Sequence, residues 1–291
     1  MISDRFVFRS HGSQIAGVLH RPVGTAQAAV VLIGPVTSVK EQASGAYARA
    51  LAERGFASLA FDPRTFGESE GEPRQFENPL AKVEDIRAAV GAFGEDSRTR
   101  GLPVMAVGVC AGGGYMAAAV AEEDRFAAFA AVAGYYSEAT PESMAVQRPA
   151  IERARAAERK WRETGAAEMI PAVGPDGGDV GMPLREAYEF YGTPRGAVPN
   201  YVNAYAVQSR AYTIPFDAIS AASRIRVPTL VIHSENALSP SLARRFIAGL
   251  SLPHEESWVR SIGQIDFYDD PPLIGIAADT IARFFSRHRA L

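Results

Sequence analysis

The chain is poor in the residues that build covalent or metallic cross-links. It has a single cysteine, Cys110, and five histidines among 291 residues. One cysteine cannot close an internal disulfide, and a metal site normally needs more ligands of this kind. We therefore expect no disulfide, no metal and no cofactor, and a reducing compartment such as the cytoplasm.

The chain also lacks an excess of charge and a long apolar run. Its formal net charge is -3, which gives no electrostatic basis for binding nucleic acid or an anionic membrane. No apolar stretch approaches the roughly 18 residues of a membrane span, and residues 1–5 lack the layout of a signal peptide. We expect a cytoplasmic protein whose partner is a small molecule, and a homodimer stays open.

Apolar strand patterns alternate with helical patterns along most of the chain, which has an ordinary 47% of hydrophobic residues. Strands are predicted at 5–9 and 14–20 (a hairpin), 28–33, 56–61, 104–108, 126–133, 228–233 and 256–262. Helices are predicted at 46–54, from Pro79 onward, at 111–122 and at 274–285. This alternation is typical of an α/β fold with a mostly parallel, doubly wound sheet.

One segment, residues 137–221, interrupts that alternation. It has no buried-strand pattern, but it contains helical stretches rich in Arg, Glu and Ala and six aromatic residues between 188 and 212. We expect a helical cap inserted into a core formed by 1–136 and 222–291. The aromatic side chains either line a substrate pocket or pack the cap against the core.

The sequence Gly108-Val109-Cys110-Ala111-Gly112 follows a predicted strand and opens a predicted helix. The G-x-C-x-G spacing is the cysteine form of the nucleophile elbow, a strained strand-to-helix corner. A helix N-terminus below Cys110 favours a thiolate. The alternative is a structural role, because a free cysteine often behaves as a small buried hydrophobe.

Motifs spread over nearly the whole chain support the catalytic interpretation. They lie at 34–42 (GPVTSVKEQ), 60–62 (AFD), 67–73 (GESEGEP), 83–86 (VEDI), 108–115 (GVCAGGGY), 191–196 (YGTPRG) and 266–269 (DFYD). With the cysteine elbow, they resemble the α/β-hydrolase superfamily, and within it the dienelactone hydrolase-like branch, in a bacterial group with cysteine at the elbow. This resemblance implies an α/β-hydrolase fold with a helical cap and acyl chemistry at Cys110.

The resemblance also implies an oxyanion hole. In hydrolases of this fold, two backbone N–H groups bind the oxyanion: one from the residue after the nucleophile and one from the loop after an early strand. Here they correspond to Ala111 and to Val36, or to Thr37 if the register differs by one.

The orienting acid expected from the resemblance is missing. The late strand ends in His233-Ser234-Glu235-Asn236-Ala237, so Ala237 occupies the usual aspartate position. Glu235 and Asn236 are the nearest polar substitutes.

The catalytic histidine expected from the resemblance is missing as well, because Gln264 occupies its position. Glutamine forms hydrogen bonds but takes up no proton at neutral pH. Candidates for the base are His233, which ends a strand at the active edge, and Glu235 or Asp266, whose pKa burial would raise. Asp266 could instead cap the local turn.

Three functions remain open. The first is a cysteine-dependent acyl-transfer enzyme, foremost a hydrolase of a small ester, thioester or lactone, in which Cys110 attacks and Gln264 positions a carbonyl or a water. The second is a cyclase, lyase or acyltransferase on the same fold, since loss of the histidine suppresses hydrolysis. The third is a catalytically degenerate binding protein.

Overall fold

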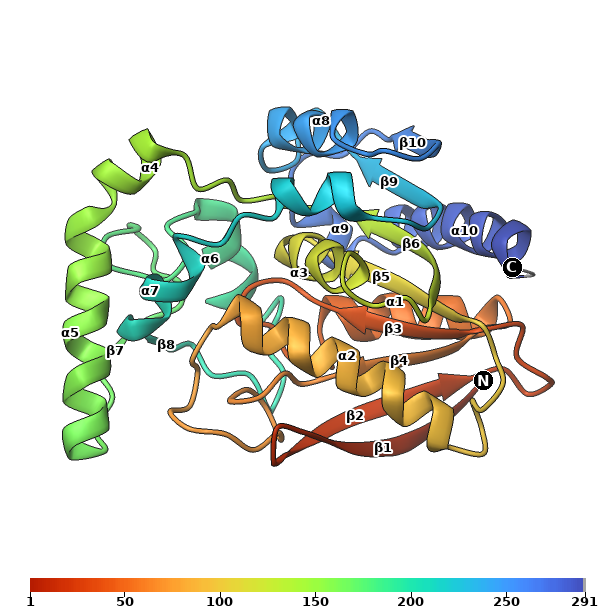
Figure 1. Cartoon of the computed structure of the whole chain (residues 1–291), viewed down its shortest axis with the longest axis horizontal. Helices are drawn as coiled ribbons and strands as arrows, with labels where there is room; N and C mark the ends of the chain where they lie inside the picture. Colours follow the sequence, from red (N-terminus) through yellow and green to blue (C-terminus); the bar gives the residue numbers. More distant parts are fainter. Residues whose placement is uncertain (290–291) are drawn as a thin grey trace.

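A single eight-stranded sheet organises the protein, whose structure is a computed structural model describing residues 1–289 (Figure 1). The strand order is β1-β2-β4-β3-β5-β6-β9-β10. The strands are β1 (Ile2–Ser10), β2 (Ser13–Arg21), β3 (Ala29–Ile33), β4 (Ala57–Phe61), β5 (Val104–Val109), β6 (Phe126–Val132), β9 (Thr229–His233) and β10 (His254–Trp258). Strand β2 alone runs in the direction opposite to the other strands of this sheet. The predicted α/β fold with a mostly parallel sheet is confirmed.

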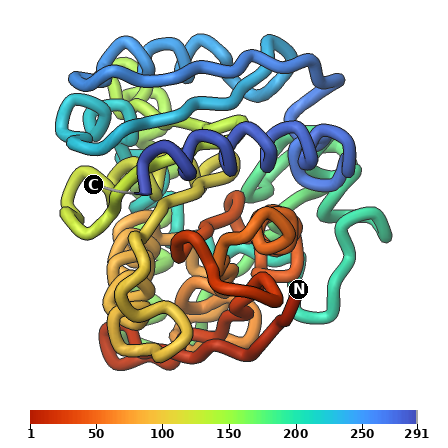
Figure 2. Tube along the Cα trace, turned by 90° about the vertical axis from the view of Figure 1, so that its right-hand side faces the viewer, coloured from red at the N-terminus to blue at the C-terminus, as the bar shows by residue number. Residues whose placement is uncertain are grey.

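The central strands are apolar along their whole length, as a sheet covered on both faces requires. All five residues of β3 and all five of β4 are buried. The edges differ: the hairpin β1–β2 forms one edge and the charged β10 the other, at the bottom and the top of Figures 1 and 2. Charged side chains on an edge strand discourage pairing with another chain.

Helices cover both faces of the sheet. They are α1 (Ala43–Glu53), α2 (Pro79–Glu95), α3 (Ala111–Val120), α8 (Pro240–Ala248), α9 (Asp266–Asp269) and α10 (Pro271–His288). Figure 1 shows α2 and α3 in front of the sheet and α1 behind it, where α10 packs beside α1. Within residues 1–289, none of the helices combines the length and apolar character needed to cross a bilayer.

Most of the segment between β6 and β9 forms a separate layer, on the left of Figure 1, whereas residues 219–224 at its end pack against α3 and α8. It contains α4 (Pro141–Val146), α5 (Arg148–Thr164), β7 (Met169–Ile170), α6 (Arg185–Tyr191), β8 (Tyr205–Ala206), α7 (Arg210–Thr213) and the 3-10 turns η1 (Val207–Ser209) and η2 (Ile219–Arg224). Besides the helices expected of a cap, the segment contains a short ribbon, because β7 and β8 pair. Strands of two residues carry too little pattern to be detected.

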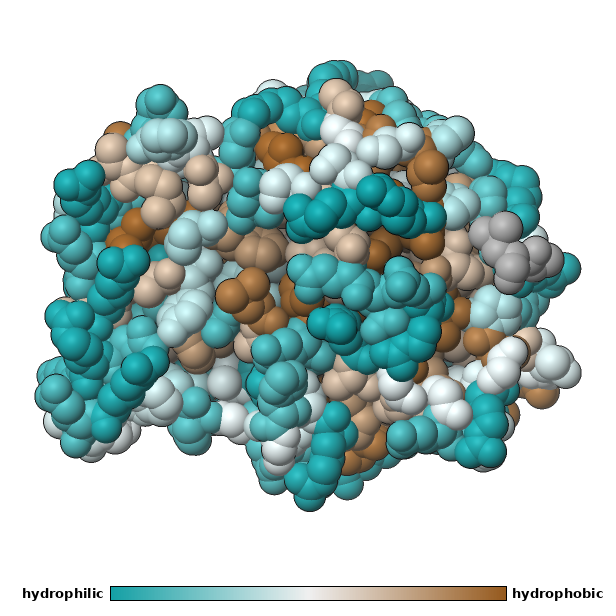
Figure 3. All heavy atoms as spheres, in the orientation of Figure 1, coloured by the Kyte–Doolittle hydropathy of each residue, from teal (hydrophilic) through white to brown (hydrophobic). Residues whose placement is uncertain are grey.

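Helix α5 forms the outer wall of this inserted segment. Its buried residues Ile151, Ala154 and Ala157 recur every three positions on one stripe, and its outer surface is hydrophilic (Figure 3, left edge). Behind α5 lies a small second core made of Ala157, Ile170, Ala172, Tyr205 and Val207. The inserted segment therefore has an apolar cluster of its own, beside the main core.

Candidate active site

Cys110 lies on the strand-to-helix corner that the sequence predicts. Its backbone angles, φ 56° and ψ -125°, are strained for a residue with a side chain, and it is the N-cap of α3. A Cβ on Gly108 would lie 2.3 Å from the Gly112 carbonyl oxygen, and one on Gly112 would lie 2.4 Å from the Ile33 oxygen. Both glycines are thus required by the close approach of β3, β5 and α3.

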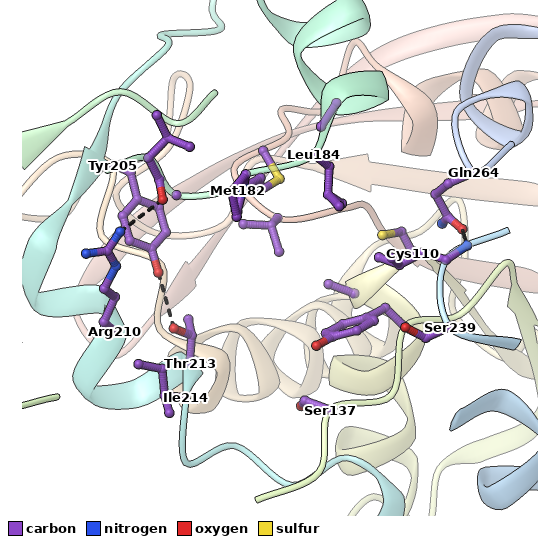
Figure 4. A pocket seen from close by; sticks show the side chains of 18 of the residues that line it. Cys110, Ser137, Met182, Leu184, Tyr205, Arg210, Thr213, Ile214, Ser239 and Gln264 are labelled. Atoms are coloured by element: carbon purple, nitrogen blue, oxygen red, sulfur yellow. Dashed lines mark hydrogen bonds between the residues drawn. The ribbon is translucent and has the colours of Figure 1, made fainter. Parts of the chain in front are cut away.

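The corner opens into a cavity of about 700 Å³ between the sheet and the inserted segment. This volume lies within the ~300–1,000 Å³ of typical small-molecule sites. The cavity wall includes Cys110 and Gln264 at one end, with Tyr205 and Arg210 at the other (Figure 4). Of the aromatic residues considered as pocket candidates, Tyr191 and Tyr205 line the cavity.

Two backbone N–H groups lie beside Cys110, and that of Ala111 faces the cysteine sulfur. Neither the Val36 nor the Ala111 N–H has an acceptor oxygen among the described residues, and both residues line the cavity. The Thr37 N–H instead donates to Glu77 Oε2 at 2.9 Å. Of the two registers, this geometry favours Val36 over Thr37.

Glu77, a residue that no sequence motif marks, anchors this loop. It is fully buried, and its Oε1 accepts a hydrogen bond from the Tyr115 hydroxyl at 2.8 Å and pairs with Lys82 Nζ at 2.5 Å. Its Oε2 holds the Thr37 N–H. Glu77 therefore links the Val36 loop to α3, which carries Ala111 and Tyr115.

Gln264 lies next to Cys110, but its amide is already engaged. Nε2 donates to the Ala133 carbonyl at 2.9 Å, and Oε1 accepts the Leu238 N–H at 2.9 Å. These two partners define which amide atom is which. The second N–H of Nε2 remains, and the Gln264 side chain lowers the pKa of Cys110 as a hydrogen-bond donor does.

Burial is the dominant influence on the Cys110 thiol and raises its pKa. The Tyr268 hydroxyl, the Ala111 N–H and the Gln264 amide oppose this effect, and the negative charge of Glu186 adds to it. The N–H of Ala111 at the helix N-terminus favours the thiolate, as expected, but burial outweighs it. Tyr268 has a pKa well above its ordinary value, again through burial, and stays protonated.

Glu186 of α6 is the carboxylate whose charge acts on Cys110, and it also lines the cavity. Its Oε2 accepts the backbone N–H groups of Gln264 at 2.9 Å and Ile265 at 3.4 Å. The inserted segment is thereby fastened to the loop that carries Gln264. No sequence motif marked this residue.

His233 is not placed to act as the base. It is completely buried and packs against Trp258, with ring centroids 5.3 Å apart. Its Nδ1 and Nε2 face the carbonyl oxygens of Ser234 (3.0 Å) and Gly134 (3.3 Å). Burial lowers its pKa, which favours the neutral form. The histidine is structural.

The two carboxylate candidates for the base also lie outside the cavity wall. Glu235 is 63% exposed and pairs with Arg244. Asp266 accepts the N–H groups of Ile262 at 2.6 Å and Gly263 at 3.3 Å, so it caps a turn. Asn236 bonds the Ser261 carbonyl at 2.8 Å. None of these residues replaces the missing acid or base.

Comparisons with known proteins agree with this architecture. The family model for serine aminopeptidase S33 matches residues 24–165. The uncharacterized protein PA2218 of Pseudomonas aeruginosa is 31% identical over 96% of this chain and 78% of the relative. The uncharacterized protein YcjY of Escherichia coli is 30% identical over 88% of this chain and 87% of the relative.

Solved structures show the same arrangement. The structure of PA2218 superposes with a TM-score of 0.86 at 30% identity, covering 99% of this chain and 94% of that one. The α/β hydrolase GrgF from Penicillium has a TM-score of 0.84 at 22% identity, with full coverage of both chains. The chain belongs to the α/β-hydrolase superfamily and is a hydrolase-fold enzyme.

Proposed function

We propose that this protein is an acyl-transfer enzyme that forms a thioester on Cys110 and passes the acyl group to a nucleophile stronger than water. Suitable donors are small thioesters, activated esters and lactones. Hydrolysis of the thioester is slower than transfer of its acyl group to such a nucleophile. Placement in the dienelactone hydrolase-like branch rests on the sequence motifs and stays a prediction.

In the acylation step, the Cys110 sulfur attacks the acyl carbon and the negative charge moves to the carbonyl oxygen. The Val36 and Ala111 N–H groups hold that oxyanion. The bond to the leaving group then breaks, and the leaving group takes up one proton while the thiol has lost one. Exchange between a thiol and a thioester is therefore proton-neutral overall and needs no permanent base.

The observation that supports transfer over hydrolysis is the state of Gln264. Its oxygen is occupied by the Leu238 N–H and one of its N–H groups by the Ala133 carbonyl, and an amide takes up no proton at neutral pH, so Gln264 does not act as a base toward water. An amine or thiol acceptor needs less activation than water. A curated relative named polyketide transferase grgF is 37% identical over 81 residues, or 28% of this chain, which is compatible with transfer chemistry.

Intact-protein mass spectrometry tests the proposal. Wild type is mixed with p-nitrophenyl esters and acyl thioesters, and we expect one acyl adduct that persists in buffer and disappears when a small amine or thiol is added. Cys110→Ser and Cys110→Ala are compared in parallel. Turnover that survives in Cys110→Ala, or the absence of any adduct on the wild type, contradicts the proposal.

A further inference from the structure

The cavity ends, away from Cys110, in a polar group made of Arg210, Thr213 and Tyr205 (Figure 4). The Tyr205 hydroxyl and Thr213 Oγ1 are hydrogen-bonded at 3.2 Å. All three residues belong to the inserted segment, on β8 and α7. Their hydroxyl and guanidinium groups are thus grouped at the end of the cavity opposite the thiol.

The wall between the two ends is mostly apolar. It includes Val180, Met182, Leu184, Ile214 and Phe216, and Figure 4 shows Met182 and Leu184 between Arg210 and Cys110. An apolar passage with a reactive thiol at one end and hydrogen-bond donors at the other suits an elongated ligand with polar groups at both ends.

Arg210 is held in position and still has donors to spare. Its Nη1 donates to Asp179 at 2.8 Å and its Nη2 to the Val180 carbonyl at 3.0 Å. A guanidinium has five N–H donors, and only these two have a partner in the part of the chain that the structure describes. The Arg210 side chain is 18% exposed, so the remaining donors would lose water to a ligand that fills the cavity.

Asp179 is shared between two arginines, because Arg153 donates to its other carboxylate oxygen at 2.5 Å. Arg153 has a further partner in Glu168, at 2.6 Å. The pair between Asp179 and Arg210 therefore fixes the direction of the guanidinium and leaves part of its hydrogen-bonding capacity to the cavity. A methyl-ended ligand would leave these donors without an acceptor.

We propose that the acyl group carried by Cys110 extends along this apolar wall and bears an oxygen function, a carboxylate or a carbonyl, at its remote end, where Arg210 binds it. The inference rests on the proposed acylation of Cys110 and names the substrate class of the same site. Arg210 is a specificity-determining residue, whereas the reacting atoms meet Cys110, Val36 and Ala111.

The first experiment measures the rate of Cys110 acylation by thioesters of matched chain length that end in a carboxyl, a keto or a methyl group. We expect the oxygenated donors to react about tenfold faster than the methyl-ended donor at the best chain length. The carboxyl and keto donors separate charge from simple hydrogen bonding as the source of the preference. Equal rates for all three donors at every length would overturn the proposal.

Variants of Arg210 link the preference to this side chain. Arg210→Gln should slow the oxygenated donors about tenfold more than the methyl-ended donor and so remove the preference, and Arg210→Lys should retain part of it. Arg185→Gln is the matched control, since Arg185 is 78% exposed and pairs with Glu189. Equal loss on all donors in both Arg210 variants would assign Arg210 a purely structural role and sink the proposal.

A binding measurement separates this proposal from the acylation chemistry. In Cys110→Ala, calorimetry with a dicarboxylic acid and the monocarboxylic acid of equal length should show about tenfold tighter binding of the diacid, lost on adding Arg210→Gln. If this difference appears while the wild type forms no adduct, the binding of an oxygen function by Arg210 is supported and the acylation of Cys110 is contradicted. Equal binding of the two acids would contradict the proposal that Arg210 binds a remote oxygen function, even if Cys110 is acylated.

Discussion

At the residue scale, Cys110 is a buried thiol beside several hydrogen-bond donors, in a cavity whose described wall contains no histidine. Burial raises the pKa of the thiol, while Tyr268 and Gln264 only partly offset this effect. Gln264 stands where the family resemblance predicts a histidine, and both ends of its amide are bound to backbone groups. The reactivity of this centre therefore depends on pH and on the acyl donor.

The rate of Cys110 alkylation by iodoacetamide should rise with pH throughout the neutral range. The thiolate is the reactive form, and burial raises the pKa of the thiol, so the thiolate fraction is small at neutral pH and grows as the pH rises. The rate is read by mass spectrometry across a pH series. A plateau reached below pH of about 7 would indicate a preformed thiolate and contradict this assignment.

Gln264→His should introduce the missing base. An imidazole beside Cys110 can activate water, and we expect the acyl adduct to decay about ten- to a hundredfold faster than in wild type. Decay is followed by intact mass. Gln264→Met, which removes the amide without adding a base, should show no such gain, and equal acceleration in both variants would point to simple loosening of the site.

At the element scale, the site depends on the contact of β3, β5 and α3 and on the loop after β3. Glycines allow the backbones to approach, and Glu77 ties the Val36 loop to α3 through Thr37 and Tyr115. These contacts orient the two N–H groups without touching the substrate. The stability of the strand-to-helix corner and the orientation of the two N–H groups can therefore be tested with different variants.

Gly112→Ala should lower the free energy of unfolding by about 2–3 kcal/mol, because the new Cβ would lie 2.4 Å from the Ile33 carbonyl oxygen. Gly275→Ala is the control. A Cβ there meets nothing within 4 Å in α10, so helix propensity should raise stability by about 0.5–1 kcal/mol. Urea denaturation measures both, and a neutral Gly112→Ala would disprove the close approach.

The double variant Glu77→Gln with Lys82→Met should acylate about tenfold more slowly. One amide oxygen cannot accept both the Thr37 N–H and the Tyr115 hydroxyl, so the link between the Val36 loop and α3 is broken at one end. Replacing both partners avoids leaving the buried Lys82 charge unpaired. Alkylation of Cys110 by iodoacetamide forms no oxyanion and should keep its wild-type rate. Parallel loss of both reactions would show general damage to the fold, and Glu68→Gln, in a separate ion-pair cluster, serves as the control.

At the scale of the whole molecule, the protein has two unequal apolar clusters. The main core spans the sheet, its helices and part of α6, whereas α5 rests on the small cluster formed with β7, β8 and η1. Few buried apolar contacts give low local stability. The outer wall of the cavity is thus the weaker part of the structure.

Hydrogen exchange should reveal this difference. Amides of α5 (Arg148–Thr164) should exchange faster than those of β3 and β5, because local opening of the small cluster requires less free energy than global unfolding. Mass spectrometry of peptic fragments gives the comparison. Equal protection in α5 and the central strands would mean that the two clusters unfold as one unit.

The sequence predicted the fold well where apolar patterns are strong and the site only where a motif is local. The apolar runs of β3 and β4 allowed both strands to be identified, but β10, with the sequence HEESW, was expected two residues too late because it is charged. Glu77 and Glu186 were missed because they act on backbone N–H groups 40 and 78 positions away. Such long-range hydrogen bonds leave no local pattern.

The Gln264 side chain, which bridges two backbone groups, is separated from histidine by a single nucleotide change. A glutamine codon differs from a histidine codon in its third base alone, so the residue that now joins Ala133 to Leu238 is one nucleotide from an imidazole. A lineage carrying this scaffold could move between retaining an acyl group and releasing it to water by that change, with the cysteine corner and the cavity left as they are.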